Sequence, residues 1–190
     1  MNKNSLKDGF KKIIVNGDYT HAITLKPNAK SSSVIYDCYR INTDETKRRI
    51  ANASLNRTAT SNPISGFSEN ALRQKLISFL ARLDRRLLGP RFNLPQYDAL
   101  RSRAFVITEG SGMSAHLHGV VKVHGSRILA INELFLESDT KHLGKQLWTS
   151  ISKGGTIDVQ PLNDVSRWAN YMLKSICETD FSDRIYITAK

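Results

Sequence analysis

The sequence predicts an α+β fold, in which an antiparallel sheet carries helices on one of its faces. Strand-like and helix-like segments follow one another roughly as β-α-β-β-α-β-α-β, an order typical of that class. A β-hairpin is also predicted, because Ala104–Glu109 and Ala115–Val123 are strand-like and Gly110–Ser114 joins them as a tight connection. At 190 residues and 40% hydrophobic content the chain can bury a core, and we expect a single domain over residues 1–190.

The N-terminal part contains a first strand and then a weakly patterned stretch. Residues 1–18 are a basic lead-in, in which Leu6–Ile14 is a candidate short helix. Tyr19–Leu25 is rich in β-forming residues and ends just before a proline, so it predicts a strand. Residues 28–66 contain runs rich in Ser, Thr and Asn and predict a long loop or insertion, within which Val34–Ile41 is a candidate short strand.

The clearest helical pattern follows this stretch. Ser68 is a suitable N-cap, and Gly89-Pro90 ends the segment. Between them apolar residues recur at spacings of three and four: Leu72, Leu76, Phe79, Leu80, Leu83 and Leu87. The other face of the helix carries Arg73, Lys75, Arg82, Arg85 and Arg86. This basic face is either a solvated surface or a surface that faces DNA.

The C-terminal half supplies the remaining elements. A helix is predicted at about 140–152, where two glycines follow it, and a strand at 156–162. Asp164 is placed to cap a final helix that runs to about Cys177. Residues 184–188 have the pattern of a closing strand.

The chain is strongly basic. Lys and Arg outnumber Asp and Glu by 28 to 17, which gives a formal net charge of +11 and a pI of about 9.8. Such a surface attracts phosphates and favours a nucleic acid as partner, although basic proteins also use charge for solubility alone.

The cysteines, the apolar runs and the N-terminal residues indicate the cellular compartment of the protein. Cys38 and Cys177 lie far apart, match no metal or redox spacing, and are expected to be thiols of a reducing compartment. No apolar run is long enough to span a membrane, and the polar N-terminus lacks the apolar segment of a secretory signal. We therefore expect a cytoplasmic protein without a membrane partner.

Two histidines stand out on the second strand of the predicted hairpin. His116 and His118 are two residues apart, so both side chains project from the same face of the strand. They are either half of a metal site or structural histidines. Glu109 ends the partner strand and reaches the same region, where it is either a third ligand or an ordinary acid beside a turn. Two imidazoles and a carboxylate would leave positions open for water and a phosphate oxygen.

The predicted final helix carries a tyrosine on its polar face. Tyr171 lies off the apolar stripe of that helix and stands between Arg167 and Lys174. A tyrosine side chain is commonly half-buried and serves only in packing. A phenol between two cations can also be held near a phosphate, and a phenolate that attacks phosphorus can later leave again. Lys174 would then screen or orient the phosphate.

These motifs together resemble the HUH endonucleases, and most closely the single-tyrosine replication initiator (Rep) proteins of rolling-circle plasmids and phages. The resemblance spans about residues 19–188. It rests on His116-Leu117-His118, on Tyr171-Met172-Leu173-Lys174, and on the strand Ala22-Ile23-Thr24-Leu25 as the weaker first motif. A tyrosine that follows the histidines favours Rep proteins over relaxases.

The resemblance implies a ferredoxin-like fold with a central five-stranded antiparallel sheet and flanking helices. It implies that His116 and His118 bind Mg²⁺ or Mn²⁺, with Glu109 as the best match to a third ligand. Tyr171 would attack a single-stranded DNA phosphodiester and become joined to the 5′ phosphate, which starts rolling-circle replication. The residues expected to contact DNA are Arg167, Thr24, Lys26, Arg85 and Arg86.

The same resemblance implies single-stranded DNA or an origin hairpin as substrate, and a monomer or weak dimer. The sequence contains no Gly-x-x-x-x-Gly-Lys-Ser/Thr loop for nucleotide phosphates, so a host helicase and polymerase are expected partners. Two alternatives stay open. One is a transposase with the same chemistry, and the other is a basic nucleic-acid-binding module with a ferredoxin-like sheet and no catalysis.

Overall fold

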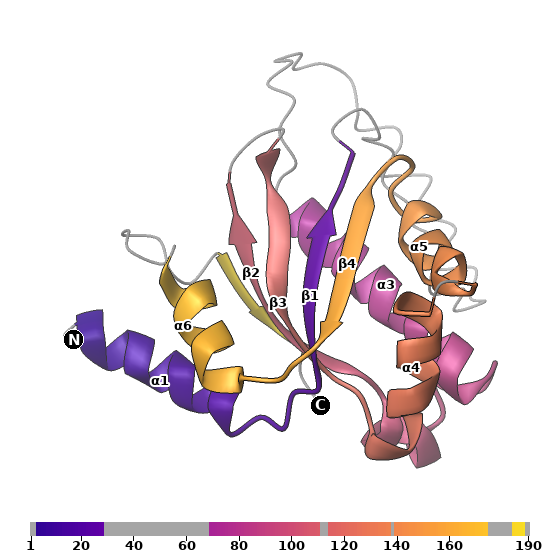
Figure 1. Cartoon of the computed structure of the whole chain (residues 1–190), viewed down its shortest axis with the longest axis horizontal. Helices are drawn as coiled ribbons and strands as arrows, with labels where there is room; N and C mark the ends of the chain where they lie inside the picture. Colours follow the sequence, from indigo (N-terminus) through magenta and orange to yellow (C-terminus); the bar gives the residue numbers. More distant parts are fainter. Residues whose placement is uncertain (1–2, 29–68, 111–113, 138, 175–183, 189–190) are drawn as a thin grey trace, which may run out of the picture.

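The computed structural model describes residues 3–28, 69–110, 114–137, 139–174 and 184–188. These residues form an antiparallel sheet with strand order β4-β1-β3-β2-β5 (Figure 1). The strands are β1 (His21–Lys26), β2 (Arg103–Glu109), β3 (His116–Lys122), β4 (Thr156–Pro161) and β5 (Ile185–Ile187). The predicted class, α+β with a five-stranded antiparallel sheet and flanking helices, is confirmed.

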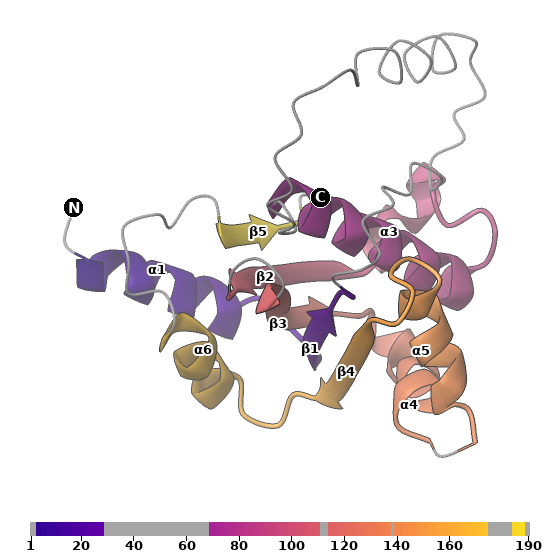
Figure 2. The ribbon, with the colours of Figure 1, turned by 90° about the horizontal axis from the view of Figure 1, so that it is seen from above.

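Helices cover both faces of this sheet, so the expectation that they lie on one face was wrong (Figure 2). The helices are α1 (Lys3–Val15), α3 (Glu69–Leu88), α4 (Ile128–Phe135), α5 (Lys141–Thr149) and α6 (Val165–Lys174), with short 3₁₀ turns at Pro95–Leu100 and Gly125–Arg127. Strands β2 and β3 are buried along five consecutive residues each. A strand that is buried on both faces needs cover on both sides, which a single helical layer cannot supply.

The alternation of β2 and β3 builds two separate cores. Leu117 and Val121 point to the layer of α3, α4 and α5, together with Val106. Phe105 and Val120 point the other way, to the layer of α1 and α6. Because successive residues of a strand face opposite sides, His116 and His118 belong to the face covered by α1 and α6.

Most predicted elements are present, with shifted ends. Helix α1 extends a few residues beyond the short helix expected in the lead-in, and its Phe10 packs edge-on against Phe105 with ring centroids 5.9 Å apart. Helix α4 was not predicted; it is only eight residues long and no side chain caps its start. The candidate strand Val34–Ile41, the cap Ser68 and nearly all of the 28–66 stretch lie outside the described residues.

Gly119 allows β2 and β3 to approach closely beside the histidines. A Cβ atom at this position would lie 2.3 Å from the Phe105 carbonyl oxygen and 2.7 Å from the Val106 Cα. Both are backbone atoms that cannot move away without breaking the ladder.

Over the described residues, no helix combines the length and apolarity that crossing a bilayer requires.

Asp84 is a buried carboxylate on α3. It is 4% exposed, and its Oδ1 accepts a hydrogen bond from the backbone N–H of Ser102 at 2.9 Å. Burial raises the pKa of this carboxyl from 3.8 to about 6, against the opposing effects of Ser102 and Arg101. The folded state therefore binds the Asp84 proton more tightly than the unfolded chain. Asp84 therefore contributes stability that is fully present below about pH 4. The free energy of unfolding falls by roughly 3 kcal/mol as the pH rises through 6.

We expect Asp84→Asn to stabilise the protein at neutral pH and not in acid. The amide keeps a carbonyl acceptor for Ser102 but does not ionise. In urea unfolding, the variant should exceed the wild type by about 1–3 kcal/mol at pH 7.5 and match it within about 0.5 kcal/mol near pH 4. An equal difference at both pH values would contradict this account.

Candidate functional site

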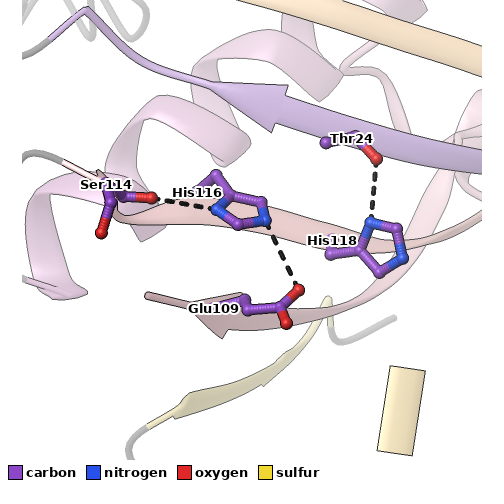
Figure 3. A network of polar contacts seen from close by, with 5 residues as sticks. All are labelled: Thr24, Glu109, Ser114, His116 and His118. Carbon is purple, nitrogen blue, oxygen red and sulfur yellow. Dashed lines mark hydrogen bonds and ion pairs between the residues drawn. The ribbon is translucent and has the colours of Figure 1, made fainter. Parts of the chain in front are cut away.

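The centre of the candidate site is His118, on the central strand. The register places His118 opposite Thr24 of β1 on one side and Ile107 of β2 on the other. The Thr24 Oγ1 and the His118 Nδ1 are 2.8 Å apart, a hydrogen bond that orients the ring (Figure 3). When Nδ1 carries the proton and donates it to Thr24, the lone pair of Nε2 is available as a ligand.

His118 is covered by two aromatic side chains of α6. The Trp168 ring centroid lies 4.8 Å from that of His118, and the Tyr171 ring meets His118 edge-on at 5.2 Å. His118 is 7% exposed, and its Nε2 is buried without a hydrogen-bond partner. Burial lowers the pKa of His118, with His116 acting in the same direction and Glu109 and Asp158 against it. The imidazole is therefore neutral at pH 7, the form that binds a cation.

His116 and Glu109 form a pair at the open end of the hairpin. The register sets them directly opposite each other, as the predicted hairpin requires. The His116 Nε2 lies 3.4 Å from the Glu109 Oε2, and its Nδ1 lies 3.0 Å from the Ser114 carbonyl oxygen (Figure 3). The Ser114 carbonyl oxygen accepts a hydrogen bond from the Nδ1–H group, and in the neutral ring the lone pair is then on Nε2, on the side of the carboxylate.

Imidazole and carboxylate are donor types that bind divalent cations, but the three side chains are not gathered around one point. In the described part of the chain, no group of three or more His, Cys, Asp or Glu side chains is arranged to hold a metal. Two ligand atoms about 2.1 Å from one cation, at an angle of about 90–110°, are about 3.0–3.4 Å apart. The 3.4 Å between His116 and Glu109 matches that spacing, and the unpartnered His118 Nε2 is a third donor on the same face.

Helix α6 positions Tyr171 through contacts on its other residues. Asp164 caps the helix as predicted, because its Oδ1 accepts a hydrogen bond from the backbone N–H of Arg167 at 2.8 Å. The Trp168 Nε1 donates to the Gly119 carbonyl oxygen at 3.2 Å, which attaches the helix to β3. Ala169 and Met172 are buried in the second core, where α6 also packs on α1. Tyr171 stays 57% exposed, with its edge on His118.

The residues expected to contact DNA are placed unevenly. Thr24 lies inside the site, bonded to His118, and Lys26 is exposed at the end of the same strand. Arg167 is exposed on α6, one turn before Tyr171. Arg85 and Arg86 are in the last turn of α3, on the opposite face of the sheet, so the structure does not bring them to the histidines.

Lys174, expected at the phosphate, is exposed in the last turn of α6. Sequence reasoning missed two neighbours of His118. Trp168 was placed only in an apolar stripe, and its indole in fact covers the His118 ring. Asp158 lies opposite Thr24 on β4, and its charge acts to raise the pKa of His118 against the larger, lowering effect of burial. The pairing of β1 with both β3 and β4 brings Asp158 near His118, and the docking of α6 brings Trp168 over its ring. Local sequence carries no signal for either contact.

Comparison of the chain with family models, with curated proteins and with solved structures found no match.

We expect Thr24→Val to destabilise the protein by about 1–2 kcal/mol, because the isosteric change leaves the buried His118 Nδ1 without its partner. Thr24→Ser is the matched control, since it keeps the hydroxyl. Urea unfolding of both variants measures the difference, and nitrogen chemical shifts of the imidazole report the tautomer. Equal stability of the valine and serine variants would show that this hydrogen bond does not hold the ring.

Proposed function

We propose that this protein is a metal-dependent endonuclease and strand transferase for single-stranded DNA, of the HUH type, which initiates rolling-circle replication. One observation carries the proposal: a solvent-accessible tyrosine of α6 rests on a buried, neutral histidine whose Nε2 has no partner. Beside that histidine, on the same face, lie a second histidine and a carboxylate. The proposal takes the tyrosine as the nucleophile and these three side chains as the cation site, supplied by separate elements.

Tyr171 is the proposed nucleophile. Its Oη forms a bond to phosphorus while the bond from phosphorus to the 3′ oxygen breaks, and the phenolic proton is lost to solvent. The departing 3′ oxygen takes up a proton and becomes a 3′-OH that can prime synthesis. The DNA is left joined to the protein through a 5′-phosphotyrosine. Attack by another 3′-OH on this linkage reverses the step and reseals the strand.

His116, His118 and Glu109 are the proposed ligands of Mg²⁺ or Mn²⁺, which when bound would polarise a phosphate oxygen. The hydrogen bond between His118 Nδ1 and Thr24 Oγ1 keeps the His118 ring in one orientation. Lys174 lies one turn beyond Tyr171 and is proposed to balance charge at the phosphate.

A single strand is the proposed substrate. The net charge of +11 supplies a general attraction for phosphates, and Arg167 and Lys26 are exposed on the face that carries Tyr171. Because the sequence has no nucleotide-phosphate loop, separation of the strands is assigned to a host helicase. A polymerase of the host would extend the released 3′-OH.

We expect Tyr171→Phe to abolish the covalent adduct. Wild-type protein, Mn²⁺ and single-stranded DNA with a randomised segment should give an adduct that survives SDS. The variant should give less than about one-thousandth of that yield, because its ring has no nucleophilic oxygen. Tyr97→Phe, a change in the Pro95–Leu100 turn, is the matched control and should react normally. An adduct of normal yield with Tyr171→Phe would exclude this nucleophile.

We expect His118→Ala to weaken Mn²⁺ binding by at least about tenfold, because it removes one donor of the set. Titration calorimetry measures the affinity, and EDTA should suppress adduct formation by the wild type. His142→Ala, at an exposed position of α5, is the control. DNA binding that gives no cleavage with any divalent metal would favour a non-catalytic binding module instead.

A further inference from the structure

We infer that a hollow beside Tyr171 binds one unpaired nucleobase, belonging to a nucleotide that flanks the attacked phosphate. This inference rests on the function proposed above and adds a site for reading sequence. The hollow has a volume of about 380 Å³ and lies between α6 and the end of β4. Its wall includes Tyr171 itself, together with Trp168, Leu162, Gln160 and Ala22.

The hollow lies on the same face of the sheet as His118. Its floor contains Ala22 of β1 and Gln160 of β4, which are opposite each other in the register. The next pair on that face is Thr24 and Asp158, and Thr24 holds the His118 ring. The hollow is therefore one residue pair along β1 and β4 from Thr24, whose partner His118 belongs to the proposed cation site, and a nucleotide can extend between the two.

The lining and the volume of the hollow suit a flat ring. Leu162 and Pro161 form an apolar side, and the half-buried indole of Trp168 forms another. The indole is held in place by its bond to the Gly119 carbonyl oxygen, and it also contacts the Tyr171 ring, with centroids 5.6 Å apart. A volume near the lower end of the range for small-molecule sites, about 300–1,000 Å³, admits one nucleoside and excludes a duplex. Aromatic walls are the usual platform for an unstacked base.

Two amide side chains in the lining of the hollow can form hydrogen bonds with the edge of a base. The Gln160 Nε2 donates to the Asp158 Oδ1 at 2.9 Å, which orients the amide and leaves its oxygen as an acceptor. Asn163 adds a second exposed amide in the lining. Amides both donate and accept, as recognition of a base edge requires.

The positive charges of Arg167 and of the protein as a whole favour a nucleotide over uncharged flat ligands. Arg167 lines the hollow and is exposed, so it can meet the phosphate attached to the base. Asp164 also lines it, but one oxygen of that carboxylate caps α6. The net charge of +11 favours the same polyanionic ligand. Because Tyr171 lines the hollow, the phosphate of a bound nucleotide would lie next to this proposed nucleophile.

The test compares base preferences around the junction. Protein is incubated with Mn²⁺ and a single strand carrying a randomised segment, covalent adducts are isolated, and the joined DNA is sequenced. The wild type should favour one base at least about fivefold at one position within two nucleotides of the phosphotyrosine. The double variant Gln160→Ala with Asn163→Ala should lower that preference to less than about twofold and leave other positions unchanged.

Matched controls remove the same side chains elsewhere. Gln146→Ala on α5 and Asn93→Ala change exposed amides away from the hollow, and both should keep the wild-type preference. Leu162→Trp fills the hollow and should act like the double variant. A second readout needs no cleavage: with EDTA present, an abasic nucleotide at the preferred position should weaken wild-type binding by about 5- to 100-fold, and binding by Leu162→Trp by less than about twofold.

The outcomes are distinct. Adducts whose base preference is the same in wild type and pocket variants would overturn the inference and leave the proposed function standing. No adduct from any sequence, with wild-type protein and metal, would overturn the proposed function and this inference with it. A loss confined to one position in the pocket variants would establish the hollow as the site that reads that base.

Discussion

Strand β3 is hydrogen-bonded along both edges, to β1 on one side and to β2 on the other, and its register determines which side chains reach which layer. A slip of one residue would send His116 and His118 into the layer of α3, α4 and α5, and would move Leu117 to the face covered by α1 and α6. Gly119 opposes such a slip, because only a residue without a side chain tolerates the 2.3 Å approach to the Phe105 carbonyl oxygen. The candidate site is therefore a consequence of how the sheet is aligned.

Helix α6 combines packing and chemistry on neighbouring residues. Its buried side, with Ala169 and Met172, anchors the helix in the second core. Trp168 contributes a ring that excludes water from His118 and a hydrogen bond to the backbone of β3. These contacts hold Tyr171 against the histidine although the tyrosine remains exposed. Tyr171 thereby keeps its position without being buried itself, which suits the role of nucleophile proposed for it.

Charge acts on this molecule at two ranges. The excess of basic residues attracts phosphates from a distance, and Arg85 and Arg86 contribute to that field from the far side of the sheet. In the proposed function, substrate contacts at the site itself are assigned to nearby exposed groups such as Arg167 and Lys26. The buried imidazole of His118 belongs to neither set, since burial lowers its pKa and keeps it neutral. Under the proposed function, attraction of the substrate and binding of a cation would fall to different residues.

The sequence by itself determined the features that depend on local periodicity and capping. These include the hairpin that sets Glu109 opposite His116, the common face of the two histidines, and the cap that starts α6 at Asp164. Only the tertiary structure decided what surrounds them. The insertion of β1 between β3 and β4 brings Thr24 to His118, and the second helical layer brings Trp168 over its ring. Strand order and helix docking are set by contacts between residues far apart in the chain, and a spacing of two or four residues carries no information about them.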